Sequence, residues 1–341
     1  MRRFPRSRPR PPVDVRGIGI LLILLLVGCA GTPQSDALRS AVPADMPSRV
    51  ELEDVPFFPQ EQYQCGPAAL ATVLTHAGHP VRPEALVPRV YLPAREGSVP
   101  VEMVATARQS GMLVYPLAPQ LADLLREVAA GHPVLVLQNL AFDWSPQWHY
   151  AVLIGFDLPA GTEVLRSGTT QRWVTPLGTF ERTWARAARR AWVILPPGEM
   201  PATARPLAYL TAAADLEQVG QREAALAAWQ AAIRTWPDEP RAWLTWGNAL
   251  YDQGDVAGAS EAFRRAVTLD PRDPAAWNNL AYALLADACP VQAVRAIDCA
   301  LRLAPADANL QDSRREIGAG AMGRDRPGCP RLTCPEAAGG H

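Results

Sequence analysis

Two side chains suited to nucleophilic catalysis, Cys65 and His149, stand where predicted elements of structure begin. Cys65 comes directly before Gly66–His76 (GPAALATVLTH), whose apolar residues repeat with the spacing of a helix. The partial positive charge at the start of a helix favours a thiolate and predicts a lowered thiol pKa. His149 lies in the apolar run Trp148–Phe156, which predicts a strand, and its apolar neighbours favour the neutral imidazole that a general base requires. A thiol and an imidazole in these positions predict Cys–His nucleophilic chemistry at an amide bond.

Glutamine side chains just before Cys65 are candidates for stabilising an oxyanion. Gln60 precedes the cysteine by five positions, and its side-chain amide is suited to act together with the backbone N–H of Cys65. Gln62 and Gln64 compete with it for this role. We take Gln60 as the first choice.

Residues 50–200 mix helix and strand patterns, which predicts one α+β domain. Strands are expected at 133–138, 148–156, 163–166 and 191–195. Within residues 92–103, Ser98 is expected to be the N-cap of a helix that has Pro100 in its first turn. The alternative for this segment is a substrate-binding lip that uses Arg95.

The segments around Cys65 and His149 resemble the bacteriocin-processing, double-glycine leader peptidases of the papain-like clan. Three stretches carry the resemblance: Gln60–Leu70 (QEQYQCGPAAL), Trp148–Val152 (WHYAV) and Gly155–Asp157 (GFD). The resemblance implies a papain-like α+β fold in which Cys65 attacks the carbonyl carbon. His149 would take the thiol proton and later protonate the leaving amine, and water would resolve the acyl-enzyme. No cofactor and no metal site are expected.

The sequence departs from these relatives where a third catalytic residue would stand. Their strand after the histidine's usually carries Asp before Pro, whereas Val164–Gly168 (VLRSG) contains no Asp. Asp157 is the nearest carboxylate downstream of the histidine and becomes the candidate that orients it. Asn139 and Asp143 are weaker candidates, and a site that works as a Cys–His dyad is also open.

Residues 206–307 repeat with a period of 34, which is plainest in Pro237, Pro271 and Pro305. Large and small residues recur in register with this period and are expected to pack the repeats together: Trp243, Gly247, Ala259, Trp277 and Ala293. The pattern resembles the tetratricopeptide repeat (TPR), a helix–turn–helix unit. It predicts an all-α solenoid of three repeats that binds a protein partner.

The tail, residues 308–341, is expected to depart from the repeat. Four cysteines in and before it form an even set: Cys289, Cys299, Cys329 and Cys334. We expect disulfide bridges that fix the tail to the third repeat, with the pairing left open. A zinc site that includes Cys329 and Cys334 is the weaker alternative.

Residues 1–28 have the pattern of a bacterial lipoprotein signal peptide. The uncharged apolar run Gly17–Val27 follows a basic segment and is too short to cross a bilayer as a helix. It leads into Gly-Cys, which resembles a lipobox and predicts lipidation of Cys29. Residues 29–49 are expected to be a tether, and Ala30 after the cysteine favours the outer membrane, facing the periplasm.

The composition bears on the function as a whole. A formal net charge of −1 without a basic stripe argues against a nucleic-acid partner. The sequence predicts a membrane-anchored periplasmic cysteine peptidase that cleaves a peptide or protein substrate and recruits a protein through its TPR repeats. The alternative is an inactive papain-like domain that acts with the repeats as a peptide-binding scaffold in the cell envelope. The substrate, and the choice between peptidase, amidase and transpeptidase, stay open.

Overall fold

An antiparallel sheet of seven strands forms the centre of the N-terminal part. The computed structural model describes residues 31–59, 64–95 and 97–335. Six strands follow the order β4-β9-β5-β6-β7-β8, and β1 pairs with the end of β6. The strands are β1 (Arg49–Glu51), β4 (Leu113–Pro116), β5 (Val134–Asn139), β6 (Trp148–Asp157), β7 (Thr162–Ser167), β8 (Thr170–Pro176) and β9 (Ala191–Leu195).

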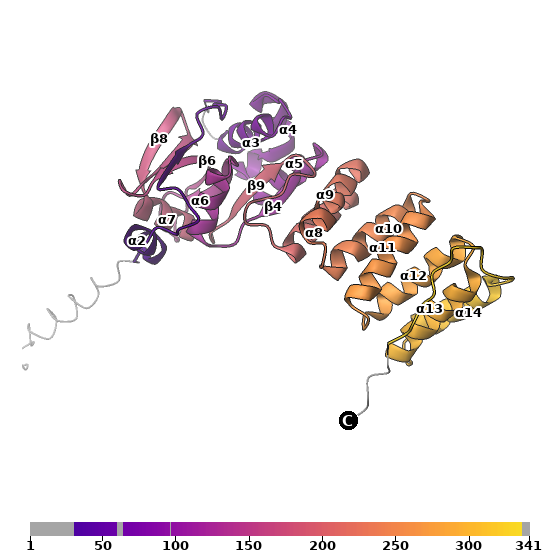
Figure 1. Cartoon of the computed structure of the whole chain (residues 1–341). Coiled ribbons are helices and arrows are strands. Elements are labelled where there is room, and N and C mark those ends of the chain that lie inside the picture. The colour runs from indigo at the N-terminus through magenta and orange to yellow at the C-terminus, as the bar shows by residue number, and fades with distance from the viewer. Residues whose placement is uncertain (1–30, 60–63, 96, 336–341) are drawn as a thin grey trace, which may run out of the picture.

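Helices cover both faces of this sheet (Figure 1). One face packs against α3 (Cys65–His76), α4 (Pro83–Val90) and α5 (Pro100–Gln109). The other packs against α2 (Pro33–Ser40), α6 (Leu121–Ala129) and α7 (Leu177–Ala185). Successive side chains of a strand point to opposite faces of the sheet. Because helices cover both faces, the side chains of β6 are apolar on both sides. Its Tyr150 and Val152 face α3, and its Ala151 and Leu153 face α6 and α7.

Most of the expected elements of the α+β domain form where the sequence predicts them. The four predicted strands correspond to β5, β6, β7 and β9, and the helix predicted after Cys65 is α3. The prediction for Ser98 was wrong: α5 has Val99 as its N-cap, no side chain caps it, and Pro100 is its first residue. Ser98 instead belongs to the two-residue strand β3 (Gly97–Ser98), which pairs with β2 (Tyr91–Leu92) beside α3. The side chain of Arg95 lies outside what the structure describes.

The segment expected to be a tether is folded from residue 33 onward. Its first turn, at the start of α2, donates to the buried carboxylate of Glu181 on α7. Gln34 N lies 3.2 Å from Oε1, Ser35 N lies 2.8 Å from Oε2, and Ser35 Oγ lies 2.6 Å from Oε2. Leu38 is buried in the core beneath the sheet. This correction has a physical reason: a short polar helix is stable when another element satisfies its terminal N–H groups and buries its apolar residue.

Three helix pairs make up the repeats. They are α8 (Pro206–Gln218) and α9 (Arg222–Thr235), α10 (Pro240–Asp252) and α11 (Val256–Leu269), and α12 (Pro274–Ala286) and α13 (Pro290–Leu303). Ala259, Ala293 and Trp277 are buried, and a side chain at Gly247 would collide with the ring of Phe263. Half-buried Trp243 donates its indole N–H to the carbonyl of Pro237, as Trp277 does to that of Pro271.

A further helix, α14 (Ala308–Gly320), shows that the tail continues the repeat instead of departing from it. Gln311 lies one period after Trp277 and donates to the carbonyl of Pro305, as the tryptophan does to that of Pro271. Asp307 caps α14 as Asp273 caps α12 one period earlier. Helix α14 is therefore the first helix of an incomplete fourth repeat, and it covers the end of the solenoid.

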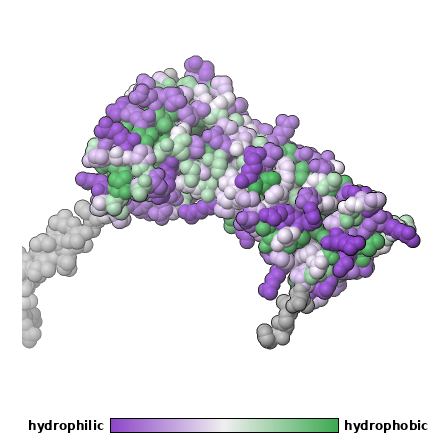
Figure 2. Space-filling model, viewed as in Figure 1, coloured by the Kyte–Doolittle hydropathy of each residue, from purple (hydrophilic) through white to green (hydrophobic). Residues whose placement is uncertain are grey.

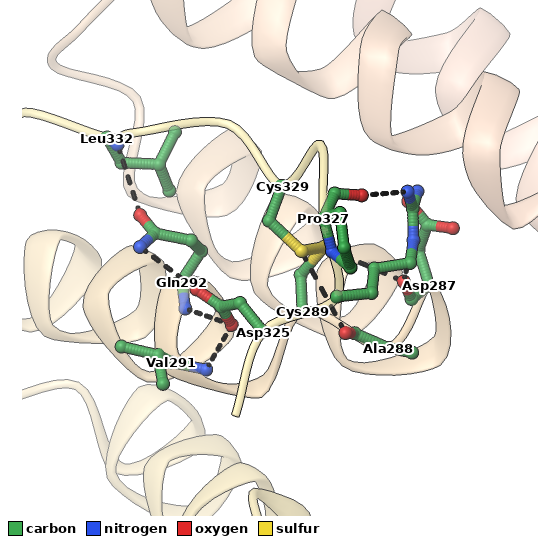
Figure 3. The surroundings of a disulfide bond; sticks show 10 residues. Asp287, Ala288, Cys289, Val291, Gln292, Asp325, Pro327, Cys329 and Leu332 are labelled. Carbon is green, nitrogen blue, oxygen red and sulfur yellow. Dashed lines mark hydrogen bonds and ion pairs between the residues drawn. A yellow bond between two sulfur atoms is a disulfide. The ribbon is translucent and has the colours of Figure 1, made fainter. Parts of the chain in front are cut away.

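Two disulfide bridges join the last described residues to the third repeat, as expected: Cys289–Cys329 and Cys299–Cys334. Figure 3 shows the surroundings of the first bridge. Asp325 accepts hydrogen bonds from the backbone N–H groups of Val291 and Gln292 at the start of α13, so the tail supplies the N-terminal cap of that helix. Leu332 is buried against the same repeat.

The first repeat packs directly on the sheet. Helix α8 contacts β4, and residues from both, including Leu113, Tyr115 and Tyr209, lie in one continuous core. The Tyr115 hydroxyl accepts from the backbone N–H of Arg205, just before α8. On the face drawn in Figure 2, hydrophobic residues surface in separate patches among polar ones. Over the described ranges of the chain, no helix has the length and apolar character needed to cross a bilayer.

Candidate active site

Cys65 is the first residue of α3 and is half-buried where that helix meets β6. Helix α3 forms here because Pro67 suits a first turn and because Leu70, Val73 and Leu74 pack on the sheet. Gly78, with a φ of 83°, ends the helix in the left-handed conformation. The thiol therefore projects from the end of a fixed, deeply packed helix.

The pKa of the Cys65 thiol is raised, not lowered as the helix position alone predicted. Burial raises it, while backbone N–H groups of Tyr150, Gly66 and Cys65 itself act in the opposite direction. The desolvation of a thiolate outweighs the favourable N–H groups at the helix start. The influence of Tyr150 N–H also locates the sulfur: it lies beside the peptide group that joins His149 to Tyr150.

His149 is half-buried at the start of β6. Burial lowers its pKa, so the imidazole is neutral at pH 7, as its apolar neighbours predicted. Within the described residues, the only hydrogen bond of the imidazole joins Nε2 to Oγ of Ser167, at 2.8 Å. No hydrogen bond joins the imidazole to Cys65 there, and Nδ1 stays available to exchange a proton.

Ser167 is a candidate site residue that the sequence pattern did not indicate. It ends β7, the strand beside β6, within the stretch Val164–Gly168 that contains no carboxylate. The pairing of Val152 with Arg166 sets Ser167 one step further along, so it reaches His149 diagonally across the two strands. A signal was present, because a hydroxyl at the end of the strand after the histidine's can also accept from an imidazole.

The structure does not bring Asp157 to His149. The two residues lie near opposite ends of the ten-residue strand β6, about 26 Å apart at the usual rise per residue. The Asp157 carboxylate pairs with Arg49 and accepts from the backbone N–H of Ala160, and both interactions lower its pKa. Asp157 therefore organises the β6–β7 turn and is not the orienting residue.

The weaker candidates for that role lie in the loop between β5 and β6. The side chain of buried Asn139 is used by its own loop: Oδ1 accepts from the backbone N–H groups of Ala141 and Gln147. Asp143 is exposed. Neither forms a hydrogen bond with His149 in the described parts of the chain.

The preferred oxyanion donor, Gln60, and its competitor Gln62 lie outside the described residues. Gln64, the third candidate, is the N-cap of α3 and is half-buried. The segment that leads toward these glutamines is held by Arg166, whose buried guanidinium donates to the carbonyls of Glu53 and Val55. The backbone N–H groups of Cys65 and Gly66 at the start of α3 remain the described donors for an oxyanion.

Gly66 lets the β2–β3 hairpin lie close to the start of α3, beside Cys65. A side chain at this position would fall on Oγ and Cβ of Ser98. The Ser98 hydroxyl is buried and has no hydrogen-bond partner in the described structure. The close contact of Ser98 with Gly66 therefore fixes one wall of the site.

No cluster of three or more His, Cys, Asp or Glu side chains in the described ranges is suited to hold a metal ion. The tail cysteines that offered a zinc alternative are joined in disulfides. The described groups of the candidate site are the Cys65 thiol, the His149 imidazole and the N–H groups at the start of α3.

Comparisons with known families match both parts of the chain. Residues 52–192 match the Peptidase_C39 like family. Residues 210–245 match the family described as tetratricopeptide repeat, and residues 247–287 match the one described as TPR repeat. No curated protein matches the sequence.

Solved structures resemble each part separately. A putative C39-like peptidase from Bacillus anthracis is 19% identical, covers 44% of this chain and 98% of its own, with a TM-score of 0.38. A double-glycine motif protease from an AMS/PCAT transporter, in complex with the leader peptide, is 22% identical, covers 42% and 92%, with a TM-score of 0.33. The first TPR of Spaghetti (RPAP3), bound to an HSP90 peptide, is 18% identical, covers 33% and 90%, with a TM-score of 0.32.

Proposed function

Since the chain carries a peptidase C39-like domain followed by TPR repeats, we propose that it is a cysteine peptidase of the cell envelope with Cys65 as its nucleophile. The observation that carries the proposal is the arrangement of His149. It is kept neutral by burial, bonded through Nε2 to Ser167, and begins the strand whose backbone adjoins the Cys65 sulfur. This arrangement suits an imidazole that removes a proton from the thiol.

The raised pKa of Cys65 and the lowered pKa of His149 favour a thiol–imidazole pair at rest over a thiolate–imidazolium pair. In the proposed reaction the proton moves from Sγ to Nδ1 of His149 as the sulfur attacks the carbonyl carbon. With Nε2–H donating to Ser167, the ring presents Nδ1 as the acceptor. The imidazolium then gives its proton to the leaving amine, and water, deprotonated by the same imidazole, releases the acyl group.

The oxyanion in this proposal is held by backbone N–H groups at the start of α3. They point out of the helix without partners in the helix itself, and the adjoining burial strengthens their effect on a developing charge. A side-chain amide from Gln60 would add to them.

The TPR repeats are proposed to recruit a protein partner or the substrate. Anchoring through lipidated Cys29 and a periplasmic location also belong to this proposal. The two disulfides support an oxidising compartment, since such bridges are rare in a reducing cytosol. Cys65 is the one free cysteine of the described chain, as a nucleophile in that compartment would have to be.

The test is labelling of the full chain in detergent by a peptide vinyl sulfone, followed by intact mass. Wild-type protein should take one label rapidly, and Cys65→Ala should take none. His149→Ala should be labelled at a rate lower than that of the wild type by about 10²-fold or more. Ser145→Ala, in the loop just before β6, is the matched control and should label as the wild type does.

A rate equal to that of a free thiol and unchanged by His149→Ala would contradict the peptidase proposal. It would favour the scaffold alternative, in which the domain binds peptides without cleaving them. The raised pKa of Cys65 makes this comparison informative, because an unassisted buried thiol would react slowly at pH 7.

A further inference from the structure

The loop between β5 and β6 exposes large apolar side chains directly before His149. Leu140 is 44% exposed, Phe142 64%, Trp144 82% and Trp148 53%. The rings of Phe142 and Trp144 stack, with their centroids 5.6 Å apart and their planes inclined by 7°. We call these four residues the apolar lip. A contiguous group of exposed apolar side chains of this size is typical of a binding site.

The lip is held in place by hydrogen bonds from the side chains of Asn139 and Arg186 and by one backbone bond within the loop. Asn139 is fully buried, and its side chain accepts from the N–H groups at both ends of the loop, 3.1 Å from Ala141 N and 2.9 Å from Gln147 N. Arg186 donates twice to the Asn139 carbonyl, and Ser145 N donates to the Phe142 carbonyl. The aromatic side chains are thus presented by an ordered loop, which lowers the entropic cost of binding.

The lip adjoins the nucleophile. Trp148 and Tyr150 alternate with His149 along β6 and so lie on the same face of the sheet, about 7 Å apart at the usual rise. Tyr150 is buried under Cys65, and its N–H acts on the thiol. Trp148 therefore lies on the face of β6 that meets the helix carrying Cys65.

One margin of the lip carries two arginines, while Asp143, between Phe142 and Trp144, is an exposed acidic side chain of the loop itself. Arg189 and Arg190 lie in the turn between α7 and β9, and the Arg190 carbonyl accepts from Leu137 N on β5, two residues before Asn139. Neither arginine pairs with a carboxylate among the described residues. Ala188 and Arg189 hold this turn with φ of 55° and 51°, a strained conformation for side-chain-bearing residues.

We propose that the apolar lip and Arg190 select the substrate: an extended peptide with a large apolar residue next to the scissile bond and an acidic residue beside it. The inference rests on the proposed function of Cys65. A peptide is the occupant because Trp148 lies on the sheet face that meets the helix carrying the thiol and because one margin of the lip offers positive charge. Helices α2 and α3 lie on opposite faces of the sheet (Figure 1), so α2, which begins at Pro33, lies away from the helix that carries Cys65.

The test compares vinyl sulfone peptides on the full chain in detergent: acetyl-Glu-Phe, acetyl-Glu-Ala and acetyl-Lys-Phe, each with the electrophile at its C-terminal end. The Glu-Phe probe should label Cys65 at least about tenfold faster than Glu-Ala and several-fold faster than Lys-Phe. Trp144→Ala combined with Trp148→Ala should remove the preference for Phe, and Arg190→Ala the preference for Glu. Trp173→Ala, which removes an equally exposed tryptophan (51%) from edge strand β8, is the matched control and should change neither.

Iodoacetamide separates this inference from the proposed function. Its reaction with Cys65 should depend on His149 and be unchanged in the lip variants. If His149→Ala leaves the rate of Cys65 alkylation by iodoacetamide unchanged, the proposed function is wrong. If it depends on His149 while the three peptides label equally, the selectivity inference alone is overturned.

Two other occupants would also overturn the inference. Quenching of tryptophan fluorescence by brominated lipid in proteoliposomes, relieved by Trp144→Phe, would assign the lip to the bilayer. A dimer in sedimentation velocity that Trp144→Ala dissociates would assign it to a second copy of the chain.

Discussion

Nε2 of His149 lies 2.8 Å from Oγ of Ser167, across the neighbouring strands β6 and β7. A hydroxyl in this place orients the imidazole without stabilising its protonated, charged form. A carboxylate in the same place would raise the pKa of the histidine, whereas burial here lowers it. The proposed base therefore works with a neutral partner and stays unprotonated into mildly acidic solution.

Replacing Ser167 by Asp should raise the pH at which the labelling rate falls when the solution is acidified, that is, the acidic limb of its pH profile. The new carboxylate stabilises the imidazolium, so the base is lost at a higher pH as the solution is acidified. Ser167→Ala should lower the rate roughly tenfold or more, because the ring is no longer oriented. Labelling rates between pH 5 and 9 measure both effects. Thr170→Ala, at the residue paired with Ser167, is the control, and an unshifted limb in Ser167→Asp would remove Ser167 from the site.

Cys65 should behave as a thiol of raised pKa when His149 is absent. Burial disfavours the thiolate, so the iodoacetamide rate of His149→Ala should rise with pH to a midpoint above that of an ordinary cysteine, about 8.5. The pH dependence of alkylation, followed by intact mass, gives the midpoint. A midpoint below 8.5 would mean that the N–H groups at the start of α3 outweigh burial.

Gly66→Ala should destabilise the domain and slow labelling of Cys65 together. The new methyl group falls on the side chain of Ser98, and such overpacking costs about 1–3 kcal/mol. Urea unfolding measures the loss. Ser98→Gly removes the colliding atoms and should restore much of the stability in the double variant. Ser98→Ala alone should cost little, because the buried hydroxyl has no partner in the described structure.

Glu163→Gln should stabilise the protein at high pH and have no effect at low pH. Burial, and secondarily the nearby Glu181, hold the pKa of Glu163 well above its usual range. The folded protein therefore keeps a proton that the unfolded chain releases above about pH 4.3, and the resulting penalty grows as pH rises. The variant should show a Tm higher by roughly 3 °C or more at pH 8 and an equal Tm at pH 4.

Glu181→Gln tests whether the neighbouring buried carboxyl group has the opposite effect on stability. It removes the charge that α2 binds, so it should lower the Tm at pH 8 while Glu163→Gln raises it. If both substitutions shift the Tm in the same direction at pH 8, Glu181 does not stabilise the fold as an acceptor for α2 while Glu163 destabilises it.

Loss of the tail disulfides should loosen the end of the solenoid first. Each bridge closes a loop of 40 or 35 residues, which chain-entropy arguments value at roughly 4 kcal/mol. In Cys329→Ser with Cys334→Ser, hydrogen exchange should accelerate in α13 and α14 but not in β5 or β6, because stability in a repeat array is passed between neighbours. Equal acceleration in the sheet would show that the solenoid and the sheet unfold as one unit.

The local elements of the site follow from the sequence, whereas their contacts across the sheet do not. The apolar spacing after Cys65 and the apolar run at His149 are enough to predict α3 and β6. The partner of His149 depends on the register between β6 and β7, which shifts at a bulge near Leu153 and Gly155. Moving that register by one residue would turn Ser167 to the other face. The carboxylate nearest to His149 downstream in the sequence, Asp157, is therefore distant from it in space.

Two other differences have a similar origin. The helix position of Cys65 is visible in the sequence, but its burial depends on strands far along the chain, and burial decides the direction of its pKa. Helix α14 was overlooked because Gln311 stands where the repeat has tryptophan. The hydrogen bond that it makes to Pro305 is nevertheless the one that the tryptophans make.

The continuous core between β4 and α8 makes the solenoid a fixed arm of the sheet. A polypeptide bound to the repeats would consequently lie at a set distance from the thiol, and only a free segment long enough to span that distance could reach Cys65. In the proposed peptidase the repeats would thus act as a ruler: where a substrate is cleaved would depend on how many residues separate its docking segment from its scissile bond, as well as on the residues at the bond.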